Sequence, residues 1–204
     1  MNFYLDFDYT LFNTYEFRNE LYKILESNNC NRDALKLTIE EGNHKLINIR
    51  EKFKELSKRK NIPIENFIKP LEELYNNCEK YIYDDSIEFL KYLKQQNHKL
   101  YILTWGEKEY QKEKVKASKL EKYVDEVIYT EKLKYNLEIQ YKEGIFIDDS
   151  VRDLKGLHAK KAKNVFRIKR VNGKNSHKEL NIEEIKEFTS LKELKEYLIR
   201  IGIN

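Results

Sequence analysis

The sequence contains few of the residues that mark disulfide-rich, zinc-binding or membrane-spanning proteins. Its 204 residues include two cysteines, Cys30 and Cys78, too few and too isolated for a disulfide framework or a zinc site. The four histidines show no spacing typical of a metal site. No stretch approaches the roughly eighteen apolar residues of a membrane span, and the chain does not open with a basic and then an apolar segment. We therefore expect a cytoplasmic protein with no membrane partner.

Glycine and proline are also scarce, with six and two residues. No internal repeat, P-loop or dinucleotide-binding fingerprint is present. The length, with 40% hydrophobic and 36% charged residues, indicates one α/β domain with a moderate insertion. The net charge of +4 suits an anionic substrate but does not by itself indicate nucleic-acid binding.

The first apolar run of the chain ends in acidic residues. Residues 3–5 predict a short buried strand, Asp6 follows it directly, and Asp8 and Thr10 come next. In an open parallel sheet, ligands bind beyond the carboxyl ends of the strands. Two carboxylates there can share a divalent cation, one serving as nucleophile and the other as acid or base. The alternative is an acidic loop, although a chance D-x-D-x-T has a frequency of only roughly 2–3% in a chain of this length.

Residues 15–83 show helical periodicity and no convincing strand. Apolar residues recur three or four positions apart, as expected for helices with one buried face. We therefore expect an all-helical insertion over 15–83 and an α/β core formed by 1–14 and 84–204. Representative pairs in the periodic segments are Phe17 and Leu21, Phe53 and Leu56, and Phe67 and Leu71.

Further apolar segments alternate with helical ones after the insertion. They predict strands over 100–103, 127–130, 144–147 and 164–168, and then only a polar turn and a terminal helix. Asp84 or Asp85 is a candidate cap for the helix that precedes the second strand. The alternation predicts a three-layer α/β sandwich with a mainly parallel sheet and right-handed connections.

Polar residues follow several of these strands. Thr104 ends the second strand beside Trp105, where the next helix can help to bind a phosphate through its free amides. Lys132 and Lys134 follow the third strand, although a surface role is the default for a lysine in this chain. The fourth strand is closed by three carboxylates, of which helix capping could explain one but not all: Asp148, Asp149 and Asp153.

These strand-end groups, taken in order, resemble the motifs of the haloacid dehalogenase (HAD) superfamily of phosphohydrolases. The similarity is most specific in the first motif, D-x-D-x-T-L, which Asp6, Asp8, Thr10 and Leu11 match. Tyr9 departs from it, because the family usually has glycine there. The resemblance implies a Rossmann-like core, with residues 15–83 as a helical cap over the active site.

The resemblance also implies roles for individual residues. Asp6 would be the nucleophile that forms an aspartyl-phosphate, and Asp8 the general acid and base, which must begin protonated. Mg²⁺ would be held by Asp6, the Asp8 carbonyl and Asp149, with Asp148 as the second choice. The remaining implied residues are Thr104, Trp105 and Lys134 (or Lys132) for the phosphoryl group, Asp153 for a metal-bound water or the lysine, and Tyr15, Glu16 and Arg18 for the substrate.

Several alternatives remain open. The helix face with Tyr15 and Arg18 could simply be solvated. The basic segment 155–178 could be a solvated edge or a patch for a nucleotide or nucleic acid. A catalytically silent binding module would keep the fold without turnover, and dehalogenation is less favoured because Asp8 suits phosphate chemistry. The favoured reading is a Mg²⁺-dependent phosphatase acting on a small phosphorylated metabolite.

Overall fold

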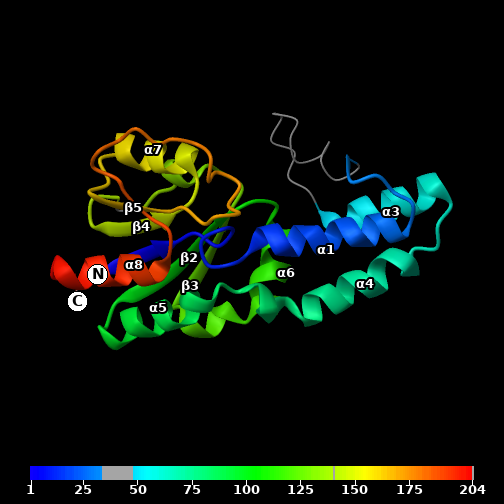
Figure 1. Ribbon diagram of the computed structural model, residues 1–204, viewed down its shortest axis with the longest axis horizontal. Coiled ribbons are helices and arrows are strands. Elements are labelled where there is room, and N and C mark those ends of the chain that lie inside the picture. The colour runs from blue at the N-terminus through cyan, green and yellow to red at the C-terminus, as the bar shows by residue number, and fades with distance from the viewer. Residues whose placement is uncertain (34–47, 140, 204) are drawn as a thin grey trace.

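The centre of the molecule is a six-stranded parallel sheet (Figure 1). The computed structural model describes residues 1–33, 48–139 and 141–203. The strands lie in the order β3-β2-β1-β4-β5-β6, and every neighbouring pair is parallel. This topology confirms the predicted α/β class. The strand bounds are β1 (Asn2–Leu5), β2 (Lys99–Trp105), β3 (Glu126–Thr130), β4 (Gly144–Asp148), β5 (Asn164–Ile168) and β6 (Lys186–Phe188).

Helices cover both faces of the sheet. On one face α5 (Asp84–Gln95), α6 (Lys108–Ser118) and α8 (Leu191–Arg200) pack against the strands, and α7 (Val151–Ala159) covers the other face. Alternate strand residues supply the two cores: Phe3 and Leu5 belong to the first, and Tyr4 belongs to the second. Both faces are therefore buried, which explains why the central strands are continuously apolar.

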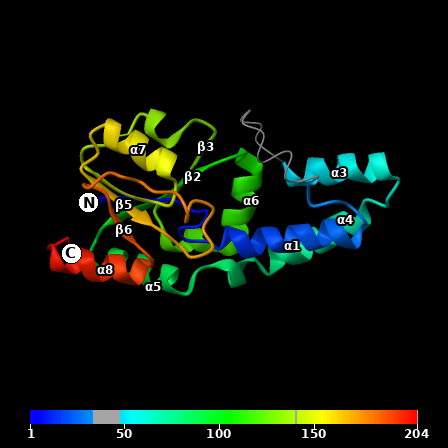
Figure 2. The same cartoon turned by 45° about the horizontal axis from the view of Figure 1, so that its top comes forward.

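A helical segment extends away from the sheet (Figures 1 and 2). It consists of α1 (Thr14–Ser27), α3 (Ile49–Lys60) and α4 (Glu65–Asn76), followed by the short 3₁₀ helix η1 (Cys78–Tyr81). The Asn13 side chain caps α1 by accepting from the Glu16 amide. Buried aromatic residues hold the segment together, among them Phe53 and Phe67, whose rings lie 5.2 Å apart. The expected helices are present, while the boundary between cap and core stays a prediction.

Two local expectations were wrong. The strand β6 was not expected, because its three residues, Lys186–Phe188, are mostly charged and pair with β5 alone at the sheet edge. The residue that precedes α5 is Tyr83, so neither Asp84 nor Asp85 caps that helix. Asp85 instead accepts from the guanidinium of Arg170 and from the Leu191 amide.

The described helices are all too short or too polar to cross a membrane.

The turn after β1 adopts a left-handed conformation at Tyr9, with a φ of 61°. This explains why glycine is common at that place in the motif, because a side chain is disfavoured there. Hydrogen bonds on both sides hold the turn: the Leu11 amide donates to the Phe7 carbonyl at 3.1 Å, and the Tyr9 amide donates to the Phe12 carbonyl at 2.8 Å. The departure from glycine therefore leaves the turn formed.

Candidate active site

Three carboxylates meet where β1 and β4 end. The strands are hydrogen-bonded neighbours, and the Asp6 amide donates to the Ile147 carbonyl at 2.8 Å. One carboxylate oxygen from each of Asp6, Asp148 and Asp149 lies within 4.8 Å of the others, and all three residues are buried. Asp149 accepts from the Asn175 side chain at 2.9 Å. The sequence placed these residues at strand ends, and the parallel pairing brings them together.

Lys134 is the cation at this cluster. Its ammonium donates to a carboxylate oxygen of Asp6 and, at 2.7 Å, to Asp148, and the side chain is only 3% exposed. Although burial acts to lower it, the carboxylates of Asp148 and Asp6 raise the pKa of Lys134, so it stays charged. Lys132 is exposed. Of the two candidate lysines, only Lys134 reaches the cluster.

A close helix contact holds Lys134 in place. Lys134 begins the 3₁₀ helix η3 (Lys134–Asn136), which packs against α7. A Cβ added at Gly156 of α7 would lie 2.0 Å from the ring of Tyr135. Glycine is therefore required at this position for η3 to approach α7.

The cluster carries more negative charge than Lys134 can balance. Burial raises the pKa of Asp6 well above its ordinary value, and burial and repulsion from Asp148 raise the pKa of Asp149 to about 7. The second oxygen of Asp6 is buried and has no hydrogen-bond partner. Three convergent carboxylates, of which Asp6 has an unpartnered oxygen, form a donor set that fits a hard divalent cation such as Mg²⁺.

The carboxylate of Asp8 is not part of this cluster and is surrounded by hydrogen-bond donors. Its carboxylate accepts from Thr14, from Gln111 at 2.8 Å and from the ammonium of Lys114 at 2.5 Å. Burial acts to raise its pKa, but Lys114 and the hydrogen bonds hold the pKa of Asp8 below its ordinary value. In this arrangement Asp8 is ionised, whereas the expected acid role requires it to begin protonated.

Sequence reasoning missed Lys114 and Gln111. Both lie on α6, which follows β2, and Lys114 is only 1% exposed. They are 106 and 103 residues from Asp8 in the chain. In a sequence rich in lysine, no local signal separates these two residues from surface positions.

The other expected phosphate ligands lie at the end of β2. The hydroxyl groups of Thr104 and of Thr10 in the first motif are both buried, and neither has a hydrogen-bond partner. Trp105 points elsewhere with its side chain: its indole donates to the Glu131 carbonyl at 3.2 Å, and the Arg152 guanidinium lies 4.6 Å from its ring. Thr104 is therefore the phosphate-ligand candidate at this strand end.

Asp153 lies near the cluster at the start of α7. It is 2% exposed, one carboxylate oxygen accepts from Arg152 at 3.0 Å, and the other has no hydrogen-bond partner. Its charge helps to raise the pKa of Lys134. This geometry suits the expected influence of Asp153 on the lysine.

The loop after β5 reaches the site through Asn175, a residue that sequence reasoning missed. The buried Arg167 donates to the Asn175 carbonyl at 2.7 Å and to Glu187 at 2.9 Å. Arg170 is also buried and pairs with Asp85. Two cations of the basic segment 155–178 thus lie in the interior, which weakens the case for a nucleic-acid patch there.

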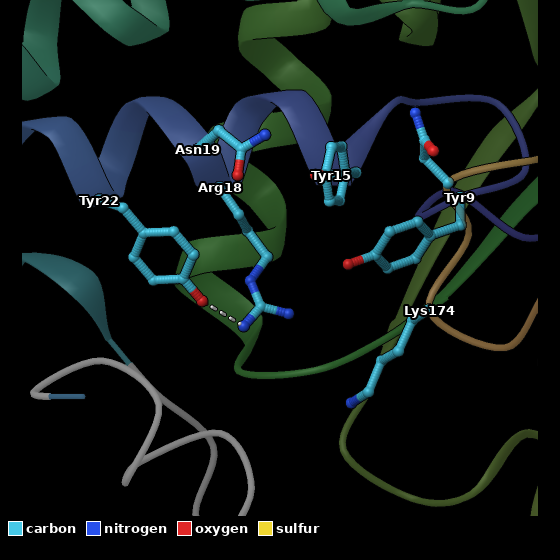
Figure 3. A pocket seen from close by; sticks show the side chains of 7 residues that line it. Tyr9, Tyr15, Arg18, Asn19, Tyr22 and Lys174 are labelled. Carbon is cyan, nitrogen blue, oxygen red and sulfur yellow. Dashed lines mark hydrogen bonds between the residues drawn. The ribbon is translucent and has the colours of Figure 1, made fainter. Parts of the chain in front are cut away.

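A cavity of about 220 Å³ opens beside the turn that carries Asp8 (Figure 3). Helix α1 lines it with Tyr15, Arg18, Asn19 and Tyr22. Tyr9 lines it from the turn after β1, and Asn172 and Lys174 line it from the loop after β5. Tyr15 and Arg18 were expected to face the substrate, and both line this cavity. Glu16 was expected there too, but it is exposed and does not line the cavity.

The fold and the cluster define a class of α/β proteins in which a parallel sheet holds buried carboxylates at the carboxyl ends of its strands. The family model for haloacid dehalogenase-like hydrolases matches residues 4–166, so the chain belongs to that family. It is a HAD-superfamily hydrolase. No curated protein matches the sequence.

Solved structures share the fold over nearly the whole chain. A Thermotoga maritima protein described as a β-phosphoglucomutase is 16% identical, with 98% of this chain and 99% of that chain covered and a TM-score of 0.63. The magnesium-bound HAD hydrolase YfnB from Bacillus subtilis is 17% identical, with 97% of each chain covered and a TM-score of 0.58. The L-2-haloacid dehalogenase from Xanthobacter autotrophicus, with chloropropionic acid covalently bound, is 15% identical, with 98% of each covered and a TM-score of 0.63. These identities support the fold alone.

Proposed function

We propose that this hydrolase cleaves phosphate monoesters with the help of Mg²⁺. The observation that carries the proposal is the cluster of Asp6, Asp148 and Asp149 around a single lysine. A carboxylate nucleophile and a phosphate dianion repel each other, so their reaction needs a site with additional positive charge. The excess of carboxylates is suited to recruit that charge as a divalent cation.

Asp6 is the proposed nucleophile. Its unpartnered oxygen attacks phosphorus, the bond from phosphorus to the leaving oxygen breaks, and an aspartyl-phosphate forms. Water then attacks the phosphorus and releases phosphate, which regenerates the Asp6 carboxylate. Lys134 and the free hydroxyl of Thr104 bind phosphoryl oxygens during both steps.

The residues that would hold Mg²⁺ are Asp6, the Asp8 carbonyl and Asp149, with Asp148 as the second choice in place of Asp149. The cation would neutralise charge on the nucleophile and the phosphoryl group.

Asp8 is proposed to transfer the protons. It protonates the leaving oxygen and then accepts a proton from the attacking water. Because Lys114 holds Asp8 in the ionised form, the acid step requires Asp8 to separate from Lys114 and to take up a proton as substrate binds. Because Lys114 lowers the pKa of Asp8, the protonation state of Asp8 can be followed in the pH dependence of the rate.

The deciding experiment measures hydrolysis of p-nitrophenyl phosphate with Mg²⁺, with EDTA and with Asp6→Asn. We expect turnover that needs both the metal and Asp6, with the fold of the variant intact by circular dichroism. The matched control is Asp84→Asn, which changes an exposed carboxylate and should keep the wild-type rate. Full activity of Asp6→Asn would refute the mechanism.

If no substrate turns over, a second experiment must distinguish a phosphatase with an untested substrate or a catalytically silent binding module from a protein without a phosphoryl site. Mg²⁺ with beryllium fluoride mimics a phosphoryl group on an aspartate. A raised melting temperature in the wild type, but not in Asp6→Asn, would then indicate a phosphoryl site without turnover on the tested substrates. No rise in either protein would argue against the phosphatase proposal.

A further inference from the structure

Helix α1 has one face that packs in the core and another that lines the cavity. Its buried face, with Phe17, Leu21 and Leu25, packs in the core. The residues of its other face recur at i, i+3, i+4 and i+7, which places them along one side of a helix. These residues are Tyr15, Arg18, Asn19 and Tyr22, and all four line the cavity (Figure 3).

Arg18 is the important group on this face, because no carboxylate of the described residues pairs with it. It is half-buried, and its guanidinium donates to the hydroxyl of Tyr22 at 2.8 Å. Figure 3 shows the hydroxyl of Tyr9 directed toward the same guanidinium. Within the part of the chain that the structure describes, no ion pair joins Arg18 to an acidic residue. A guanidinium keeps several donors for an anion when its neighbours are neutral phenols.

A second cation lies across the cavity. Lys174 reaches toward it from the loop after β5 (Figure 3). The two cationic side chains therefore line one space from different elements, and the described residues that line this space include no acidic one. Both charged residues in the described lining are therefore cations.

The cavity lies next to the proposed reaction site. Tyr9 lines the cavity and follows Asp8 in the chain. Lys174 lines it too, and the next residue, Asn175, donates to Asp149. A substrate whose phosphate lies at the carboxylate cluster would therefore have this cavity as its neighbour. The volume of about 220 Å³ is below the roughly 300–1,000 Å³ of a typical whole-ligand pocket, so it suits one compact group of the substrate.

We propose that the cavity lined by Arg18 and Lys174 binds a second anionic group of the substrate, a carboxylate or a second phosphate. The inference rests on the proposed phosphatase function and deepens it, because it narrows the substrate to a small phosphate monoester that is also an acid. Arg18 binds the anion through paired hydrogen bonds, and Tyr9 and Tyr22 orient the guanidinium.

The experiment compares probes that differ in one group. 3-Phosphoglycerate carries a carboxylate where glycerol 3-phosphate has a hydroxymethyl group, and fructose 1,6-bisphosphate carries a phosphate that fructose 6-phosphate lacks. We expect the more anionic member of at least one pair to have the lower KM. In Arg18→Gln the KM for that probe rises about ten- to a hundredfold, the effect of one charged hydrogen-bonding group, while the KM for its partner changes less than about twofold.

Matched variants control for folding. Lys23→Gln removes a cation from the same helix at an exposed position, where it pairs with Glu20, and it should leave both KM values unchanged. Lys174→Gln changes an exposed loop residue and should weaken the same preference without altering the melting temperature. The pair of probes that responds identifies the anion as carboxylate or phosphate.

A binding measurement separates this inference from the proposed function. Calorimetry with Asp6→Asn and Mg²⁺ measures affinity for the same probes without turnover. If wild type hydrolyses no probe but the acidic probe binds tighter and loses this advantage in Asp6→Asn/Arg18→Gln, the anion site stands and the phosphatase proposal fails. If wild type hydrolyses both members of each pair equally well and Arg18→Gln changes neither KM, the phosphatase stands and the second-anion site is wrong. Equal binding of paired probes in calorimetry would also overturn it.

Discussion

Replacing Lys134 by methionine should strongly destabilise the metal-free protein. Methionine keeps much of the apolar stem but leaves the carboxylates of Asp6 and Asp148, which are 7% and 4% exposed, without their cation. Removing one partner of a buried ion pair costs about 3–5 kcal/mol. For a protein of this size each kcal/mol corresponds to about 2–4 °C, so we expect a melting temperature about 6–20 °C lower in EDTA.

The assay is thermal unfolding followed by circular dichroism at pH 7.5, with EDTA or with Mg²⁺. The control is Lys132→Met, two residues away and exposed, which should cost less than about 0.5 kcal/mol. Mg²⁺ should raise the melting temperature of Lys134→Met more than that of wild type, because the cation offsets the same carboxylates. A Lys134→Met protein that melts with wild type in EDTA would refute the assignment of Lys134 as the neutralising group.

Three further results are expected. Asn175→Ala should weaken Mg²⁺ binding by about ten- to a hundredfold in calorimetry, because Asn175 orients Asp149; Asn172→Ala in the same loop should not, and equal affinities would exclude this role. The pKa of Asp149 is raised to about 7 in the folded state, whereas the unfolded chain releases this proton above about pH 4. Between these two pH values the unfolded state is favoured by the release of the proton, so Asp149 lowers the free energy of unfolding more and more as the pH rises toward 7. Asp149→Asn should therefore raise the melting temperature in EDTA more at pH 7.5 than at pH 5, and an equal effect at both pH values would contradict this reasoning. In Lys114→Met the pKa of Asp8 should rise, because burial then acts without the opposing cation, and the limb of the kcat/KM profile due to Asp8 should move to higher pH; an unshifted limb would mean that Lys114 does not control Asp8.

Much of the fold could be predicted because each central strand is a short, continuously apolar run between helical segments. Residues 144–147 are an example: both faces of β4 are buried, and these four positions are all apolar. The strand β6 could not be predicted in this way. Its residues Lys186–Phe188 carry no apolar run, and β5 alone provides its pairing.

The acidic part of the site could also be predicted. Asp6 and Asp149 were recognised because each follows an apolar run, and parallel strands all end at the same edge of the sheet. The sequence could not decide between Lys132 and Lys134. That choice depends on which of the two side chains turns inward, and in the fold it is Lys134, at the start of η3, where Tyr135 packs closely on Gly156.

By itself, then, the sequence determined the α/β class and the residues at the strand ends, because periodicity and strand termini are local properties of the chain. The tertiary structure alone decided which distant groups meet them. Lys114 reaches Asp8 across 106 residues, Asn175 reaches Asp149 from the loop after β5, and Arg18 and Lys174 line one cavity. Such pairings depend on strand order and loop path. No pattern of neighbouring residues encodes them, because a lysine, an asparagine or an arginine has the same local signature on a solvated surface as in a site.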